Sequence, residues 1–349
     1  MQNRTHMMKE IMEQDHVLDA CKQYNEKVME GLAKAIKEFA PESVVFAARG
    51  TSDHAATFAR YIFEIYCSIP VSLAAPSVIT AYGNESLNLS RSLVIGISQS
   101  GAAADANAVI SAARKQGGLT ITITNTLGSL MAENADYHIY CNAGKEESVA
   151  ATKSFLTSIY PLTWLAAQLS GNQELVDSLA RLPKAVSDAL SLNEEIANTA
   201  KTFRFMDECF VLSRGICYPI AMEAALKIQE TSYVRGRCYS VSDFHHGPFA
   251  MVSEHTPVII IAVDKYTNGD AGEMIQKLKK AQAYTLVITT DKDLAGQAND
   301  SILLPEWMNH IEGAFAAAIV AQQFACHLAV LKGNNPDQPR GLNKVTVTL

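Results

Sequence analysis

Three apolar runs recur in the chain at one fixed spacing, and this repeat limits the possible folds more than any other feature. The runs that begin at Val44, Ser92 and Thr120 have counterparts 165 residues later, which begin at Cys209, Pro257 and Thr285. The first run and its counterpart both end in Arg-Gly. Three matches at a single spacing predict two copies of one structural unit.

Each copy alternates strand-like apolar runs with helical patterns. In the first copy we expect strands at residues 43–48, 71–75, 93–97, 119–124 and 137–141. This alternation predicts a parallel sheet with helices on both faces and with ligands beyond the carboxyl ends of the strands. The predicted fold class is α/β, with two tandem doubly wound parallel sheets of the flavodoxin-like type.

Helical segments precede and join the two predicted sheets. The expected division is a helical arm over 1–25, a first domain over 26–175, a helical connection over 176–200, a second domain over 201–334 and a C-terminal tail over 335–349. Within this scheme an apolar helix over 148–169 closes the first domain.

The composition predicts a compact protein with a small-molecule partner. Hydrophobic residues make up 48% of the 349 positions and charged residues 19%, which is enough to bury a large core. The net charge is −7, and no run of lysine and arginine stands out. This balance argues against binding to nucleic acid or to an acidic membrane surface.

The cysteines and the N-terminus bear on the cellular compartment. Seven cysteines are widely spaced and never occur as Cys-x-x-Cys, so neither disulfides nor a zinc site is predicted. The N-terminus has no apolar signal core, and we expect no apolar run of the roughly 18 residues that a membrane span needs. We therefore expect a soluble, cytoplasmic protein.

The third predicted strand leads into a polar turn, Ser98-Gln99-Ser100-Gly101, and then into an alanine-rich helix. Side-chain donors beside the N–H groups of a helix N-terminus favour a bound phosphate. An ordinary strand-to-helix turn would also contain serine and glycine. The second copy has Val263-Asp-Lys-Tyr266 at this place, a poor anion site. The asymmetry favours one phosphate site, in the first copy.

The helix predicted over 219–233 carries Glu223, Lys227 and Glu230 in one stripe, because their spacings are four and three. Its other positions are mostly apolar, which indicates a buried helix. A solvated Glu–Lys pair is the alternative interpretation. In the buried interpretation a carboxylate could move a proton between substrate atoms.

Two adjacent histidines, His245 and His246, precede Gly247-Pro248 in a predicted loop or turn. A backbone fixed by proline can aim an imidazole, although a surface histidine without a role is equally typical. Adjacent side chains diverge and no third ligand has suitable spacing, so the pair does not indicate a metal site. The tail after Asn335 is rich in turn residues and is expected to fray.

Six motifs occur in the order seen in proteins with two sugar isomerase (SIS) domains: Gly50-Thr-Ser52, Ser98-Gln-Ser-Gly101, Val149-Ala-Ala-Thr-Lys153, Glu223-Ala-Ala-Leu-Lys227 with Glu230, His246-Gly-Pro248 and Pro339-Arg-Gly-Leu-Asn-Lys344. The chain resembles the isomerase half of glucosamine-6-phosphate synthase. Its Arg49-Gly-Thr-Ser-Asp-His54 motif and its ending make it still more similar to the stand-alone glucosamine-6-phosphate deaminases of the family.

The resemblance implies a role for each matched residue. Thr51, Ser52, Ser98, Gln99 and Ser100 would hold the sugar phosphate, and Val149 and Glu223 would belong to the substrate-binding set. Glu230 would move a proton between C1 and C2, His246 would open the sugar ring, and Lys227 would position the sugar oxygens. Lys344 would contact the open chain near C1 and C2, where an ammonium can stabilise a developing enolate.

The resemblance also implies a homodimer in which the His246 loop serves the partner's site. Two departures leave the substrate open: Ala102-Ala-Ala104 follows the phosphate turn where the synthase has acidic and hydroxyl residues, and Ala151 replaces a usual serine. Glutamine hydrolysis is not expected, because residue 2 is Gln and the first cysteine is Cys21.

The implied activity is that of a phosphosugar isomerase/deaminase, which converts a glucosamine-6-phosphate type of substrate to a ketose 6-phosphate and releases ammonia. No metal or organic cofactor is implied. The alternatives are a deglycase of amino-acid-conjugated sugar phosphates, a plain aldose/ketose phosphate isomerase, and a phosphosugar sensor without catalysis. The sensor would bind a sugar phosphate without turnover.

Overall fold

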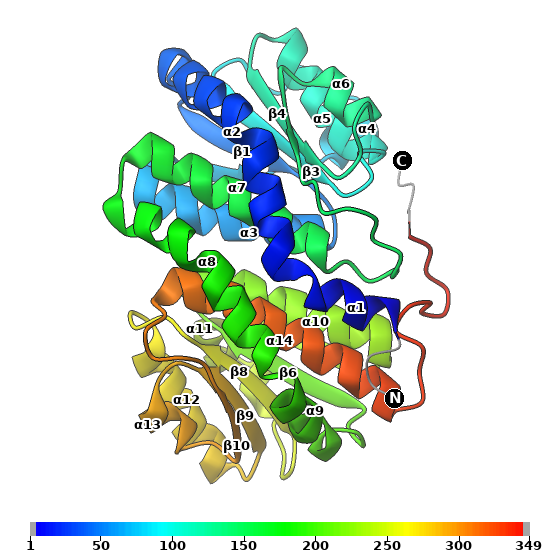
Figure 1. Ribbon diagram of the computed structural model, residues 1–349, viewed down its shortest axis with the longest axis vertical. Helices are drawn as coiled ribbons and strands as arrows, with labels where there is room; N and C mark the ends of the chain where they lie inside the picture. The colour runs from blue at the N-terminus through cyan, green and yellow to red at the C-terminus, as the bar shows by residue number, and fades with distance from the viewer. Residues whose placement is uncertain (1–4, 345–349) are drawn as a thin grey trace. The chain divides into compact units, whose positions relative to one another are not determined.

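The computed structural model describes residues 5–344 and contains two five-stranded parallel sheets. Their strand orders are β2-β1-β3-β4-β5 and β7-β6-β8-β9-β10, so the two sheets have the same topology. The predicted α/β class and the internal repeat are confirmed. Figure 1 shows helices on both faces of each sheet.

The contacts divide the chain into two compact units, which are interleaved along the sequence. The first-sheet unit comprises residues 16–146, 153–179 and the described part of the tail from 343, and the second-sheet unit comprises 5–15, 147–152 and 180–342. The domain boundaries expected from the sequence stay predictions, and residues 345–349 of the predicted tail lie outside the described residues.

The first-sheet unit is built around β1–β5. Its strands are β1 Ser43–Ala47, β2 Val71–Leu73, β3 Ser92–Ser98, β4 Leu119–Thr124 and β5 Tyr137–Tyr140. Its helices are α2 Gln14–Phe39, α3 Thr51–Ile62 with a π-helical extension Phe63–Cys67, α4 Ser77–Thr80, α5 Ala104–Lys115, α6 Leu130–Asn134 and α7 Lys153–Ser170. All seven residues of β3 are buried, as expected for a central parallel strand.

The second-sheet unit repeats this plan. Its strands are β6 Glu208–Ser213, β7 Arg235–Ser240, β8 Pro257–Ala262, β9 Tyr284–Thr289 and β10 Asp300–Leu303. Its helices are α1 His6–Met12, α8 Gln173–Ser191, which begins in the first-sheet unit, α9 Asn193–Thr202, α10 Tyr218–Ser232, α11 Val241–His245, α12 Asn268–Lys280, α13 Lys292–Ala295 and α14 His310–Leu331. Short 3₁₀ turns cover Gly215–Cys217 and Pro248–Met251.

One sequence-based expectation about the helices was wrong. The helix expected from Ser148 begins only at Lys153. The backbone N–H groups of residues 147–149 are instead hydrogen-bonded to Glu10 and Asp337, which are distant in the sequence. By length and composition one helix, α14, could cross a membrane, although Glu312, Gln322 and Gln323 interrupt its apolar residues. However, 89% of its most apolar window is buried inside the structure, which is typical of a core helix.

The core helix α14 packs against α9 and α10. It begins with a capping box, in which the Asn309 side chain accepts the backbone N–H of Glu312 and the Glu312 side chain accepts that of Asn309. The fully buried Glu312 carboxylate also lies 2.6 Å from Nη2 of Arg181 on α8. These bonds fix the start of α14.

The N-terminal helix α1 binds segments distant in sequence. The carboxylate of Asp337 accepts the backbone N–H groups of His6 and Met7, at 2.9 and 2.8 Å. The carboxylate of Glu10 accepts those of Glu147 and Ser148. All six residues belong to the second-sheet unit, so hydrogen bonds join the first and last segments of this unit along the sequence.

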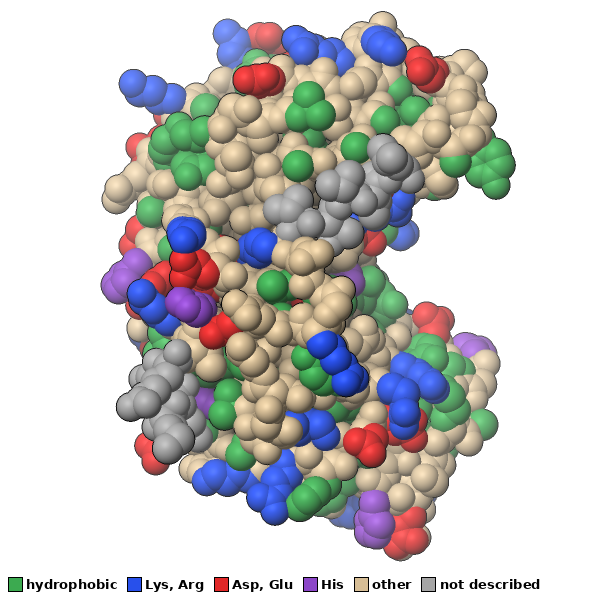
Figure 2. All heavy atoms as spheres, turned by 90° about the vertical axis from the view of Figure 1, so that its right-hand side faces the viewer, with side chains coloured by type: hydrophobic (Ala, Val, Ile, Leu, Met, Phe, Trp, Pro, Cys, Tyr) green, Lys and Arg blue, Asp and Glu red, His purple; other side chains and the backbone are tan. Residues whose placement is uncertain are grey.

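Charged side chains of both signs occur across the face of the molecule in Figure 2. Lys and Arg side chains alternate there with Asp and Glu, and hydrophobic side chains form separate small groups. The face shown therefore presents no broad region of one charge.

Candidate functional site

The turn after β3 is stabilised by hydrogen bonds to the side chains of its own serines. Ser98 Oγ accepts the backbone N–H of Gly101 at 3.2 Å, and Ser100 Oγ accepts that of Ala102 at 3.3 Å. Because each hydroxyl accepts in these bonds, its O–H is available as a donor. The helix α5 then starts without a side-chain cap, since its N-cap residue is Ala103. The turn thus has the donors that an anion requires.

Gly101 is the residue that allows this turn to form. Its φ is +66°, and an added Cβ would lie 2.0 Å from Ser129 Oγ. Gly50, which precedes Thr51 and Ser52, also has a positive φ of +55° but has open space around it. Only at Gly101 do both the backbone conformation and the surrounding atoms require a glycine.

The sheet brings the two predicted phosphate-binding segments together. β1 and β3 are neighbouring parallel strands, with Ala47 opposite Gly96. After β1 the chain forms β2 on one side of β1 and then β3 on the other side. The carboxyl ends of β1 and β3 therefore flank the topological switch point of this sheet. Thr51 and Ser52, the first residues of α3, therefore follow the strand next to the Ser98 turn.

The corresponding turn of the second sheet contains its own anion. The nearly buried Asp264 accepts the backbone N–H of Tyr266 at 3.0 Å, and its Oδ2 would lie 3.2 Å from a Cβ added to Gly215. A carboxylate in this position repels a phosphate. This geometry agrees with the sequence-based expectation that the Val263–Tyr266 turn is a poor anion site.

The α10 stripe is a buried ion cluster. Lys227 Nζ lies 3.3 Å from Glu223 Oε1 and 2.6 Å from Glu230 Oε2. The side chains of Lys227 and Glu223 are 1% and 2% exposed, whereas that of Glu230 is 22% exposed. The alternative of a solvated surface pair is therefore wrong, and Glu230 is the member of the cluster that solvent can reach.

The charge on Lys227 is maintained by its neighbours. Burial by itself would lower the pKa of Lys227, because the charged form loses its hydration. The carboxylates of Glu223 and Glu230 outweigh this effect and raise the pKa to about 12. An ammonium that stays charged holds the Glu230 carboxylate in one place on the helix.

His246 ends the short helix α11 and is exposed. The backbone N–H of His246 donates to the backbone carbonyl of Asp243 at 3.0 Å, and the following Gly247 has a φ of +138°. The helix is anchored by Phe244, which is fully buried and lies 5.1 Å from the Phe210 ring. The histidine therefore lies on the surface of a firmly packed segment.

Val149 lies in an irregular segment before α7, next to two residues that are hydrogen-bonded to α1. Its N–H donates to Asp337 O at 3.2 Å, and Glu10 binds the two residues before it. Neither acidic residue could be singled out from the sequence, because their partners are more than 130 residues away. They determine the path of the backbone that was predicted to line the sugar.

Lys344 lies against a buried carboxylate. Its Nζ is 2.8 Å from Oε2 of Glu146, whose side chain is fully buried. Glu146 also accepts the N–H and the hydroxyl of Ser154 near the start of α7. Glu146 was not among the predicted site residues, although it lies three residues before the Val149 motif.

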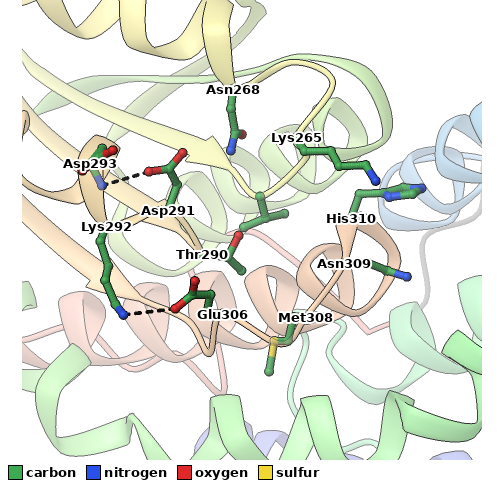
Figure 3. A pocket seen from close by; sticks show the side chains of 11 residues that line it. Lys265, Asn268, Thr290, Asp291, Lys292, Asp293, Glu306, Met308, Asn309 and His310 are labelled. Atoms are coloured by element: carbon green, nitrogen blue, oxygen red, sulfur yellow. Dashed lines mark hydrogen bonds and ion pairs between the residues drawn. The ribbon is translucent and has the colours of Figure 1, made fainter.

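A cavity of about 430 Å³ lies in the second-sheet unit, beyond the carboxyl ends of β8 and β9 (Figure 3). Its polar residues largely bind one another: Lys292 Nζ lies 3.1 Å from Glu306, and Asp291 caps α13. Lys265 is the only other lysine among the lining residues, which also include the carboxylate of Asp293. Three carboxylates against two ammonium groups make this cavity a poor phosphate site.

The structure therefore groups the predicted residues by unit. Thr51, Ser52, Ser98, Gln99, Ser100 and Lys344 lie in the first-sheet unit, and Val149, Glu223, Lys227, Glu230 and His246 lie in the second-sheet unit. Across residues 5–344, no three His, Cys, Asp or Glu side chains come together as metal ligands. The role of each predicted residue stays a prediction.

Comparison with known proteins identifies the family. The model of the SIS domain matches residues 39–167 and 206–332. The chain is 31% identical to a glutamine–fructose-6-phosphate aminotransferase (isomerizing) of Thermococcus kodakarensis, over 98% of its own length. It spans only 58% of the length of that relative.

Solved structures agree with this relationship. The C-terminal domain of glucosamine-fructose-6-phosphate aminotransferase from Francisella tularensis superposes with a TM-score of 0.85 and 26% identity, covering 96% of this chain and 98% of that domain. Glucosamine-6-phosphate deaminase from Thermotoga maritima shares the fold, with a TM-score of 0.76 and 23% identity over 99% of this chain and all of the other. The chain thus belongs to the SIS domain family, with two copies of the domain.

Proposed function

We propose that this chain is a phosphosugar isomerase/deaminase, which converts an amino-sugar 6-phosphate of the glucosamine 6-phosphate type to a ketose 6-phosphate and ammonia. The observation that carries the proposal is Glu230, a partly exposed carboxylate bound to the fully buried ammonium of Lys227. A fixed carboxylate of this kind is suited to moving a proton between adjacent carbons.

The reaction needs few groups. Opening of the sugar ring, assisted by His246, exposes an aldehyde at C1. Glu230 removes the proton from C2, which gives a 2-amino enolate with its negative charge on the C1 oxygen. Glu230 then returns the proton to C1, and a proton from the nitrogen moves to the C1 oxygen, which leaves an imine at C2. Water adds to the imine, ammonia leaves, and the ketone forms. The ammonium of Lys344 would stabilise the negative charge that develops on the C1 oxygen.

The phosphate is assigned to the turn after β3 and the start of α3. Ser98, Ser100 and the uncapped N-terminus of α5 supply hydroxyl and backbone donors, and Thr51 and Ser52 add theirs from the start of α3, which follows the neighbouring strand β1. We assign the protein to the cytoplasm, which agrees with its seven cysteines being free thiols.

We also propose that the protein acts as a homodimer in which His246 serves the partner's site. The exposure of His246 on a well-anchored helix supports this. Mixing two inactive variants, Glu230→Gln and His246→Ala, should then restore part of the activity, because some mixed dimers contain one intact site. Mixtures that stay inactive under conditions of subunit exchange would contradict the shared site.

The reaction is tested by incubating the protein with glucosamine 6-phosphate, an amino-acid conjugate of fructosamine 6-phosphate, and glucose 6-phosphate. Ammonia together with fructose 6-phosphate is the expected result. Release of a free amino acid would instead identify a deglycase, and ketose formation without ammonia a plain isomerase. Binding without turnover of any substrate would reject the enzymatic proposal and leave the sensor. Glu208→Gln, on an exposed strand end, serves as a control variant.

A further inference from the structure

Arg49 lies two residues after the end of β1 and is paired with the helix that follows the proposed phosphate-binding turn. The pairing of β1 with β3 ends with Ala47 opposite Gly96, and Arg49 and Ser98 each lie two residues beyond this last pair. Its Nε donates to Oδ2 of Asp105 at 2.6 Å. Asp105 is in the first turn of α5, so the Arg49 side chain reaches from β1 to the helix that follows the turn.

Asp105 orients one edge of the guanidinium and leaves the other edge available. Asp105 is 2% exposed, and its second oxygen accepts the N–H of Ala106 at 2.8 Å. The Arg49 side chain is 54% exposed, and its two Nη nitrogens make no hydrogen bond within residues 5–344. A guanidinium held at one edge is arranged to bind a phosphate through two parallel hydrogen bonds.

The second copy of the domain contains the same pair and serves as an internal comparison. Arg214 and Asp270 occur 165 residues after Arg49 and Asp105, with Nη1 of Arg214 2.6 Å from Asp270. The pair therefore belongs to the repeated fold. In the second copy, however, a terminal nitrogen of the arginine is used by the pair, and Asp264 places a carboxylate in the neighbouring turn.

We propose that Arg49 is a ligand of the substrate's phosphate and that Asp105 is its positioning residue. This inference rests on the proposed function, since it requires a phosphorylated substrate. The start of α5 supplies no side-chain donor, because it reads Ala102-Ala-Ala104. Arg49 supplies the cationic donor on that side of the phosphate and thereby determines the preference for phosphorylated sugars.

The experiment measures binding of fructose 6-phosphate and of fructose by isothermal titration calorimetry. The variants are Arg49→Gln, Arg49→Lys and, as the matched control in the other copy, Arg214→Gln. Loss of a hydrogen bond between charged groups should weaken the binding of fructose 6-phosphate to Arg49→Gln by about 10- to 100-fold. Arg214→Gln should bind within about twofold of the wild type. In turnover, KM should rise more than kcat falls.

Thermal unfolding without ligand shows which variants are folded. If Arg49→Gln fails to fold because Asp105 has lost its cation, Arg49→Lys decides the question. A lysine keeps a charge near Asp105 but lacks the planar fork, so binding should still weaken several-fold. Wild-type affinity in a folded Arg49 variant would overturn the inference about Arg49 and leave the proposed function intact. Failure of the wild type to bind fructose 6-phosphate would overturn the proposed function as well.

Discussion

The buried ion cluster on α10 makes a strong prediction about stability. Lys227→Met removes a cation that lies between two carboxylates, at 3.3 Å from Glu223 and 2.6 Å from Glu230. Removing one partner of a buried ion pair costs about 3–5 kcal/mol, because the remaining charge loses its compensation. For a unit of 150–250 residues, this cost lowers the midpoint of thermal unfolding by about 6–20 °C.

Two further variants separate this effect from a general loss of packing. The double variant Glu223→Gln/Lys227→Met also removes a buried carboxylate, so it should regain at least half of the lost stability. Lys34→Met removes a lysine from an exposed i,i+4 pair, in which the Lys34 and Glu38 side chains are 78% and 69% exposed. It should change the free energy of unfolding by less than about 1 kcal/mol.

The assay is unfolding in urea and by heat, followed by circular dichroism. A Lys227→Met protein that unfolds within about 1 kcal/mol of the wild type would refute the reasoning. A double variant that is no more stable than the single one would also refute it, because the cost would then lie in the lost lysine side chain and not in the buried charge.

Three other predictions concern proton transfer, backbone conformation and pH. Glu230→Gln should abolish exchange of the C2 proton with solvent deuterium, followed by NMR, while fructose 6-phosphate still binds within about twofold; unchanged exchange would remove Glu230 from its role. Gly101→Ala should lower the unfolding temperature far more than Gly50→Ala, because both have positive φ but only the first would clash, at 2.0 Å from Ser129 Oγ; equal losses would contradict this. Burial raises the pKa of the Cys141 thiol to about 12, above the unfolded value, so stability should fall as the pH rises from 9 toward 12; Cys141→Ala should reduce the loss in unfolding free energy between pH 8 and 10 by about 1 kcal/mol, and an unaltered pH dependence would count against it.

The central strands could be predicted because each is a short, continuous apolar run. β3 and β4 match the predicted ranges to within a residue, and β8 and β9 begin within a residue of the predicted apolar runs at Pro257 and Thr285. β7 was missed, since Arg-Gly-Arg-Cys-Tyr-Ser has no such run and belongs to an edge strand with one neighbour. Its partner β6 supplies the pairing, which the local sequence does not reveal.

The site could be predicted only where its chemistry is local. The α10 stripe follows from helical spacing alone, and the structure brings Glu223, Lys227 and Glu230 into contact. Asp105 and Glu146 were missed, because a carboxylate shows its role only when the fold brings its cation close. Such residues look like any other acidic residue in the sequence.

The bonds between α1 and Asp337 have a consequence for synthesis on the ribosome. At about 5–20 residues per second, His6 and Met7 emerge some tens of seconds before the carboxylate that accepts their N–H groups. Strands β1–β5 are complete by Tyr140 and can pair while the ribosome is still translating. The second-sheet unit, in contrast, reaches its final hydrogen bonds only after residue 337 has left the exit tunnel. A nascent chain stalled before this point should therefore expose α1 to proteases or chaperones.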